Sequence, residues 1–409
     1  MTRDLLGAAN RVAGDMVDLR RAIHREPELG LQNPLTARKV REALAALPLT
    51  FREGGSTSGF VARIDGAKPG PVVLLRADMD ALPIHERTGL DYASTIDGVM
   101  HACGHDAHAA MLVGAAHLLW ERRDAMQGSV LLMFQPGEEG YHGARHMLDD
   151  GLIDPLPDAA FALHIAPDVP LGLVRGRQGP LLASADHVTI TVTGRGAHAS
   201  TPHRGRDPVP AACSIAIHLQ TLVTRRLDVF DGAVVTVGQI HAGTAYNIVA
   251  EEAVLDVSVR ALSAETRSTV EAEIRRLVAG IAAAHGVEAR VDYRDGFPAT
   301  ICDARAAEHG RRTVERLFGA EGWSTLPQPY MNSEDFSYVL EKVPGAMFMI
   351  GAGQGGDVSA ACCALHSGDL MFDEAVLPRG AALHAALALD YLAERFNPPA
   401  DERAEPPAH

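Results

Sequence analysis

The segment from residue 100 to residue 108 concentrates residue types that bind metal ions. It reads Met-His-Ala-Cys-Gly-His-Asp-Ala-His, with Cys103 and His105 two positions apart and Gly104 allowing a bend between them. A thiolate and an imidazole where a loop enters a helix can point at one cation, and mixed sulfur, nitrogen and oxygen donors suit zinc or another first-row ion. The alternative is that each is an ordinary polar residue near the core, because one Cys-x-His pair is a weak signal.

Further candidate ligands follow short apolar runs. Runs of this kind, bounded by Gly and Pro and separated by helix-length segments, are typical of strands buried on both faces of a mostly parallel sheet. Ligands of such sheets bind beyond the carboxyl ends of the strands, so we expect the residues after the runs to converge there with Cys103 and His105. The runs are Val72–Leu75, Val130–Phe134, Phe161–Leu163 and Met347–Ile350, and the polar residues that follow them are Asp78, Asp80, Glu138, Glu139, His164 and His366. The predicted metal ligands are Cys103, His105, Glu139, His164 and His366.

The adjacent residues Glu138 and Glu139 suggest two different roles, one as a metal ligand and one as a general base. Neighbours on an extended or turning segment face different ways, so both cannot bind one ion well. We predict that Glu139 binds the cation and that Glu138 is the general base for a water that the cation activates. The alternative is a solvated acidic turn.

A rival chemistry makes Cys103 a nucleophile beside a histidine. It leaves Glu139, His164 and His366 without a role, which favours the metal site. The five cysteines are odd in number and sparse for 409 residues, so we expect no disulfide framework and a reducing, cytoplasmic location. The adjacent pair Cys362 and Cys363 is most simply a pair of ordinary buried thiols, although metal-linked oxidation is the alternative.

Length and charge narrow the class of protein. A chain of 409 residues is too long for one hydrophobic core and indicates two or three domains. The 37 basic residues against 52 acidic ones give a net charge of −15, which repels nucleic acids and anionic membranes. We expect neither a secretory signal nor a membrane-spanning helix, because no apolar run is long enough.

The residue pattern changes between about Ser184 and Phe297, where apolar and polar residues alternate as in a half-exposed strand. The order of predicted elements there is β-α-β-β-α-β, a ferredoxin-like arrangement. We therefore expect an α/β domain in two parts, 1–183 and 298–409, interrupted by a smaller domain, 184–297. The predicted strands of the smaller domain are 187–193, 233–240, 254–261 and 288–294, and its helices are 208–225 and 264–284. Near the start of the chain, residues 15–47 are predicted to be helical, with Asn33 as a helix N-cap before Pro34.

Three polar residues of the inserted domain are candidates for substrate contacts. His198 follows a glycine-rich turn and could donate a hydrogen bond to a developing oxyanion. Asn247 and Arg260 could hold a carboxylate, Arg260 in bidentate fashion. Taken alone, each is more often a surface turn residue or part of a structural ion pair.

Five motifs, taken together, resemble the metal-dependent amidohydrolase branch of the aminoacylase/carboxypeptidase family. That branch includes hippurate hydrolases, auxin-conjugate hydrolases and N-acetyl-diaminopimelate deacetylases, and the similarity runs from about residue 15 to residue 395. The motifs occur in the family's order and spacing. They are His101-Ala-Cys-Gly-His-Asp-Ala-His108, Gln135-Pro-Gly-Glu-Glu-Gly140, Gly196-Ala-His-Ala-Ser200, Glu334-Asp-Phe-Ser337 and His366-Ser-Gly-Asp-Leu-Met-Phe-Asp-Glu374.

The resemblance implies a zinc-peptidase-like α/β catalytic domain interrupted by a lid domain that also forms a homodimer or a higher homo-oligomer. It implies one or two divalent ions, zinc first and manganese, cobalt or nickel as alternatives, commonly with Cys103 between two of them. Glu138 takes the role of base, and His198 matches a lid histidine that reaches the partner's active site. Asn247 and Arg260 match positions that bind substrate.

One departure from the family concerns the pair Asp78 and Asp80. Other branches place a metal-binding His in a His-x-Asp pair there, so these aspartates are expected to orient the ligand histidines from behind. The resulting hypothesis is hydrolysis of an N-acyl amino acid to a carboxylic acid and a free amino acid. The rivals are a dipeptidase or carboxypeptidase with the same metal centre, and a non-catalytic protein that binds metal or an amino acid.

Overall fold

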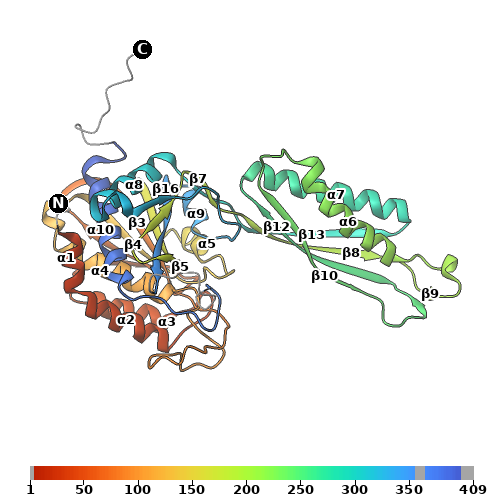
Figure 1. The fold of residues 1–409 in the computed structure, drawn as a ribbon, viewed down its shortest axis with the longest axis horizontal. Coiled ribbons are helices and arrows are strands. Elements are labelled where there is room, and N and C mark those ends of the chain that lie inside the picture. The colour runs from red at the N-terminus through yellow and green to blue at the C-terminus, as the bar shows by residue number, and fades with distance from the viewer. Residues whose placement is uncertain (1–3, 355–363, 398–409) are drawn as a thin grey trace, which may run out of the picture. The chain divides into compact units, whose positions relative to one another are not determined.

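The computed structural model describes residues 4–354 and 364–397, and the chain forms two compact units. The first unit comprises Met1–Leu181, Ile301–Pro327 and Tyr338–His409, and the second comprises Leu182–Thr300 and Gln328–Ser337 (Figure 1). Strands β7 (Gly179–Leu182) and β14 (Thr300–Cys302) lie where the chain crosses from one unit to the other. Within the described ranges, we find no helix with both the length and the apolar character needed to cross a bilayer.

An eight-stranded sheet forms the centre of the first unit. Its strand order is β1-β2-β4-β3-β5-β16-β6-β15, and the pairs β3–β4, β3–β5, β5–β16 and β6–β15 are parallel. This sheet confirms the predicted mixed, mostly parallel α/β class. The strands are β1 (Thr50–Glu53), β2 (Phe60–Asp65), β3 (Lys68–Asp78), β4 (Gln127–Gln135), β5 (Ala159–Pro170), β6 (Val174–Gly176), β15 (Trp323–Thr325) and β16 (Gly345–Gly353).

The four apolar runs of the sequence lie in β3, β4, β5 and β16. In β3, Val73, Leu74 and Leu75 are fully buried whichever face their side chains point to, as expected where both faces of a sheet are covered. Since β3, β4 and β5 are adjacent and parallel, their carboxyl ends share one edge of the sheet. The residues that follow these strands are therefore brought together by the topology.

Helices cover this sheet. The helix α4 (His105–Trp120) packs against β3 and against α10 (Val376–Glu394), and all but two of its residues are buried. A helix that is apolar on all sides belongs in the interior, which fits its place between the sheet and other helices. The remaining helices of the first unit are α1 (Leu5–Arg11), α2 (Ala13–Arg25), α3 (Pro34–Leu44), α5 (Gly143–Asp149), α8 (Ala304–Phe318) and α9 (Ser337–Leu340), which begins at the boundary.

The helical prediction for residues 15–47 was wrong for the segment between Arg25 and Pro34, where the helix is interrupted. Asn33 is the N-cap residue before Pro34, as predicted, but its side chain makes no capping hydrogen bond. The Glu28 carboxylate accepts the backbone amides of Leu35 at 3.1 Å and Thr36 at 2.8 Å instead. The carboxylate of Glu28, five residues before Asn33, thus accepts hydrogen bonds from two of the free amides at the start of α3.

The second unit is an antiparallel sheet of order β10-β12-β8-β13 with two helices on one face (Figure 1). Its element order is the expected β-α-β-β-α-β, and each predicted element is present to within a few residues. Valines, leucines and isoleucines of the strands and both helices form one buried core. The elements are β8 (Ala185–Thr193), α6 (Pro208–Arg226), β10 (Ala233–Ala242), β12 (Glu252–Ala261), α7 (Ala264–His285) and β13 (Glu288–Phe297), with the short strands β9 (Ala197–His198) and β11 (Ile248–Val249).

Candidate active site

Gly104 shapes the loop that carries Cys103 and His105. It is the residue before α4 and has a left-handed backbone, with φ of 83°. A Cβ there would lie 2.3 Å from Cδ1 of Ile165, so a side chain has no space. The close approach sets the two candidate ligands beside Ile165, in the middle of β5.

The structure brings all five predicted ligands together in the first unit. Their donor atoms form two groups of three, and the atoms of each group lie within 4.8 Å of one another. Within them, Cys103 Sγ lies 3.4 Å from His164 Nε2, and His366 Nε2 lies 3.2 Å from Glu139 Oε1. Cys103 is the member that both groups share. The groups are Cys103 with His105 and His164, and Cys103 with Glu139 and His366.

Asp80 fixes the backbone of the two glutamates that follow β4. Its Oδ1 accepts the amide of Glu138 at 2.9 Å, and its Oδ2 accepts the amide of Glu139 at 3.0 Å. Its Oδ1 also lies 3.5 Å from His105 Nδ1. The expectation that Asp80 stands behind a histidine therefore describes only part of its contacts, since its hydrogen bonds go to the turn that carries Glu138.

Asp78 has a different partner from the one that the sequence suggested. Its Oδ1 accepts from His108 Nδ1 at 2.6 Å, and its Oδ2 accepts from Arg76 at 2.6 Å and lies 3.6 Å from His105 Nε2. Burial alone would raise the pKa of the Asp78 carboxyl, but the Arg76 guanidinium and two neighbouring imidazoles hold it well below its ordinary value. Asp78 is therefore an anion in the interior.

The ring of His164 is oriented by its own strand. Its Nδ1 donates to the carbonyl of Ile165 at 2.7 Å, and the amide of Ile165 donates to His108 Nε2 at 2.9 Å. Because a carbonyl only accepts, the proton of His164 is on Nδ1 and the lone pair of Nε2 faces Cys103. Burial lowers the pKa of His164 to about 3, so the ring is neutral, as a metal ligand must be.

The donor set fits a divalent cation. Both ring nitrogens of buried His105 lack hydrogen-bond partners among the described residues. Buried polar atoms without partners are rare in folded proteins and call for an explanation such as an ion. The surrounding carboxylates favour positive charge at this point, and sulfur, imidazole and carboxylate donors are those of zinc and its first-row neighbours.

Two further pKa shifts agree with this electrostatic character. Burial raises the pKa of the Cys103 thiol, so a thiolate needs a cation beside it. Hydrogen bonds to Cys103 and Glu139 raise the pKa of His366 to about 10. His366 also has a left-handed backbone, with φ of 63°, and its amide donates to the carbonyl of Ala102 at 2.7 Å. A strained non-glycine residue is thus held next to the Cys103 loop.

Sequence reasoning missed a buried polar network behind α4. Asp106 accepts from Arg20 Nε at 2.7 Å and from His24 Nδ1 at 2.8 Å. A second Arg20 nitrogen donates to Glu374 at 3.0 Å. The sequence signal was weak, because Arg20 and Asp106 are 86 residues apart and each resembles a surface residue. His108 carried a usable signal, since it lies one helical turn after His105.

The candidate residues of the second unit divide into two places. The pairing of β9 with β11 sets His198 opposite Ile248, and the amide of Ala199 donates to the carbonyl of Asn247 at 3.0 Å. His198 and Asn247 line one pocket of about 750 Å³. Arg260 lies near the other end of β12, where it donates to the carbonyl of Met331 at 3.2 Å. This unit therefore does not bring Arg260 to the other two candidates.

Other candidates from the sequence have no place in the described site. Cys362 and Cys363 lie outside the described residues.

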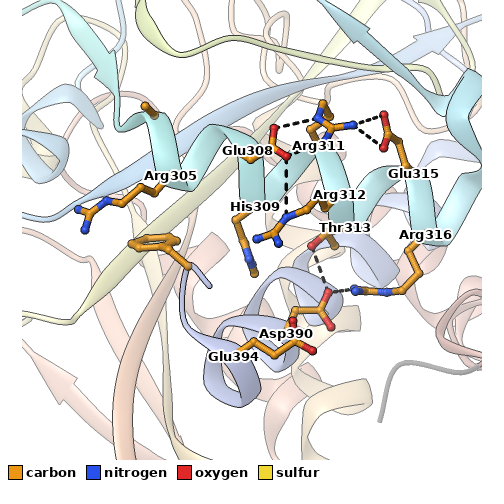
Figure 2. A pocket seen from close by; sticks show the side chains of 12 residues that line it. Arg305, Glu308, His309, Arg311, Arg312, Thr313, Glu315, Arg316, Asp390 and Glu394 are labelled. Carbon is orange, nitrogen blue, oxygen red and sulfur yellow. Dashed lines mark hydrogen bonds and ion pairs between the residues drawn. The ribbon is translucent and has the colours of Figure 1, made fainter. Parts of the chain in front are cut away.

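A pocket of about 800 Å³ between α8 and α10 contains none of the predicted site residues (Figure 2). Arg311 pairs there with Glu308 and Glu315, and Asp390 pairs with a further arginine, so most of its charges are already matched.

Comparison with known proteins decides the family. The family model described as "Peptidase family M20/M25/M40" matches residues 74–390. The chain belongs to this family. It is similar to IAA-amino acid hydrolase ILR1-like 2 of Arabidopsis thaliana, with 37% identity over 384 residues that cover 93% of this chain and 86% of the relative. It is also similar to thermostable carboxypeptidase 1 of Saccharolobus solfataricus, with 35% identity over 380 residues that cover 92% and 95% of the two chains.

A solved structure extends the family assignment to the metal. The YXEP protein of Bacillus subtilis, described as a dinuclear metal binding peptidase, superposes with a TM-score of 0.81 and is 32% identical. The match covers 94% of this M20-family chain and 99% of that protein. With the candidate ligand groups, the comparisons establish a metal-dependent enzyme that hydrolyses amide bonds.

Proposed function

We propose that this M20-family enzyme hydrolyses N-acyl amino acids to a carboxylic acid and a free amino acid. The supporting observation is the double group of donors that shares Cys103, with the carboxylate of Glu138 beside it. The named activity of the plant relative, on IAA-amino acid conjugates, supports the same substrate class. The predicted ligands would hold one or two divalent ions, which supply Lewis-acid polarisation of the amide carbonyl and a lowered pKa for water.

Glu138 is the residue that moves the proton in this proposal. It follows a buried strand, is 7% exposed, and its backbone is fixed by Asp80. Its carboxylate takes a proton from the attacking water and returns it to the departing amine nitrogen. Glu139, whose amide is held by the same aspartate, stays a ligand.

His198, Asn247 and Arg260 would contact the substrate. His198 would donate to the oxyanion of the tetrahedral intermediate, and Arg260 would hold the substrate carboxylate. Val254 of β12 lines the same pocket as His198 and therefore marks its position along the strand. Arg260 is six residues further along β12, which is a distance of about 20 Å from Val254 at the rise of a β-strand. This separation supports a homodimer in which His198 and Asn247 of one copy serve the site of the other.

The test of the base is Glu138→Gln. We expect the variant to keep its metal content and to lose at least about 100-fold in kcat on N-acetyl and N-benzoyl amino acids, since the amide cannot accept the proton. Glu121→Gln, at a side chain that is 57% exposed, is the matched control and should keep the wild-type rate. A metal-loaded Glu138→Gln protein with near wild-type kcat would rule out the assignment. A wild-type protein that binds these compounds without turnover would show a binding protein instead.

A second candidate function is a carboxypeptidase or dipeptidase, because the archaeal relative carries the name carboxypeptidase. Both activities need the same metal centre and differ in how the substrate's amino end is recognised. Rates on N-acyl amino acids and on unblocked dipeptides with the same C-terminal residue separate them. We expect kcat/KM to be higher for the acylated substrates.

A further inference from the structure

We propose that Ser200 is a positioning residue that keeps the proton of the His198 ring on Nε2. The inference deepens the proposed function, because it rests on His198 as the donor to the oxyanion. A histidine serves there as a neutral donor only if the nitrogen that faces the substrate carries the proton. The contacts that decide which nitrogen is protonated all lie within the second unit.

Ser200 contacts Nδ1 of His198 twice. Its backbone amide lies 3.1 Å from Nδ1, and its Oγ lies 2.7 Å from the same atom. A backbone amide only donates, so Nδ1 must accept and cannot carry a proton. The hydroxyl then also donates to this lone pair. In the neutral ring the single proton is therefore on Nε2.

The surrounding turn holds Ser200 in this position. The amide of Thr201 donates to the carbonyl of His198 at 2.8 Å, and the amide of Ala199 donates to the carbonyl of Asn247 at 3.0 Å. The pairing of β9 with β11 holds the backbone of His198 itself. The turn thus places both donors of Ser200 at Nδ1 without a metal or a substrate.

The hydroxyl matters because the imidazole is exposed. An exposed histidine without a contact samples both tautomers and several rotamers in water. The Oγ contact is the shorter of the two and spans two residues, so it also restrains the ring against rotation. Removal of the hydroxyl leaves only the longer amide contact.

The experiment compares Ser200→Ala and Ser200→Thr in the full-length, metal-loaded enzyme. Nitrogen-15 histidine spectra with long-range proton couplings report which ring nitrogen carries the proton, and His198→Ala identifies the signal. We expect the Nε2–H form in the wild type and in Ser200→Thr, and a mixture of tautomers in Ser200→Ala. We expect kcat of Ser200→Ala to fall about 3- to 10-fold with KM within about twofold, and Ser200→Thr to restore it.

Thr201→Ala is the matched control, because its hydroxyl contacts the His198 carbonyl at 3.4 Å and not the ring. It should keep both the wild-type tautomer and the wild-type kcat. An Nε2–H signal that is unchanged in Ser200→Ala overturns the inference, whatever happens to kcat. Full activity in His198→Ala overturns the proposed role of His198 instead, and the spectra separate the two failures.

Discussion

Asp80 binds the backbone amide of Glu138 at 2.9 Å with one carboxylate oxygen and the amide of Glu139 with the other. One buried side chain, two residues after the end of β3, therefore sets the turn after the neighbouring parallel strand β4. The bridge therefore fixes the backbone from which both the proposed base and the proposed ligand extend.

Asp80→Asn should impair this turn. An asparagine can accept only one of the two amides, because its NH2 group opposes the other donor. We expect metal affinity or kcat to fall about 10- to 100-fold, the usual effect of losing a residue that orients metal ligands. Metal titration and steady-state kinetics measure both quantities. Asp124→Asn, at a side chain that is 89% exposed, is the control, and equal behaviour of the two variants would contradict the prediction.

Removal of metal separates the metal mechanism from a cysteine nucleophile. We expect a chelator to abolish hydrolysis and added zinc or manganese to restore it. Cys103→Ala should lose about half or more of the bound metal, because this thiol belongs to both ligand groups, while the exposed Cys213 can be replaced by Ala without loss. Elemental analysis gives the metal content. Activity that survives chelation and is lost on alkylation would favour the nucleophile.

The buried network behind α4 predicts a large loss of stability for Arg20→Met. The arginine side chain is 3% exposed, and its removal leaves the fully buried Asp106 with His24 as its one side-chain hydrogen-bond partner among the residues that the structure describes. Breaking a buried ion pair from one side typically costs about 3–5 kcal/mol. Arg11→Met, which breaks an exposed pair with Asp4, should cost less than about 1 kcal/mol. Thermal unfolding of the metal-loaded proteins compares them, and similar midpoints would refute the buried charge effect.

His309 predicts a loss of stability in acid. Burial lowers its pKa to about 4, and its Nε2 donates to the carbonyl of Leu387 at 3.1 Å. As the pH falls, the unfolded chain takes up a proton on this histidine first, near pH 6.5. The free energy of unfolding that the neutral, buried ring contributes is therefore complete above pH 6.5 and is lost as the pH falls toward 4. Between pH 7 and pH 5 the loss amounts to about 2 kcal/mol.

The variant His309→Phe checks this prediction. A phenyl ring keeps the packing against Phe161, at 5.5 Å between ring centroids, and cannot be protonated. Its free energy of unfolding should be lower than that of the wild type at pH 7 but should change less between pH 7 and pH 5. Urea unfolding at the two pH values provides the comparison. Parallel pH dependence in the two proteins would exclude His309 as the source.

The sequence predicted the elements whose signal is local. Apolar runs identified β3, β4, β5 and β16, and alternation identified the strands of the second unit. The convergence of Cys103 with Glu139 and His366 followed from one topological rule, that parallel strands end at one edge. The observed cluster agrees with that rule, and the role of each residue as a ligand stays a prediction.

Contacts between segments that are far apart in the sequence could not be predicted from residue patterns. Nothing near Asp78 indicated that it would bind His108, and nothing near Asn33 indicated that the Glu28 carboxylate would accept the first amides of α3 in place of the Asn33 side chain. Both outcomes depend on packing that brings separate segments within hydrogen-bonding distance, and residue patterns carry no such information. The distance between Arg260 and His198 depends likewise on where the strand β12 begins and ends.

The strip Gln328–Ser337 completes the second unit from far along the chain, where Asn332 accepts the amide of Ala183 and Met331 accepts a hydrogen bond from Arg260. In the first unit, β16 is inserted between β5 and β6 and ends only at Gly353. During synthesis, neither unit has all of its parts until most of the chain has left the ribosome. The residues that form the core of the second unit all lie between Val188 and Tyr293, whereas the core of the first unit needs the late elements β16 and α10. A nascent chain that stops before β16 therefore exposes the incomplete core of the first unit to chaperones.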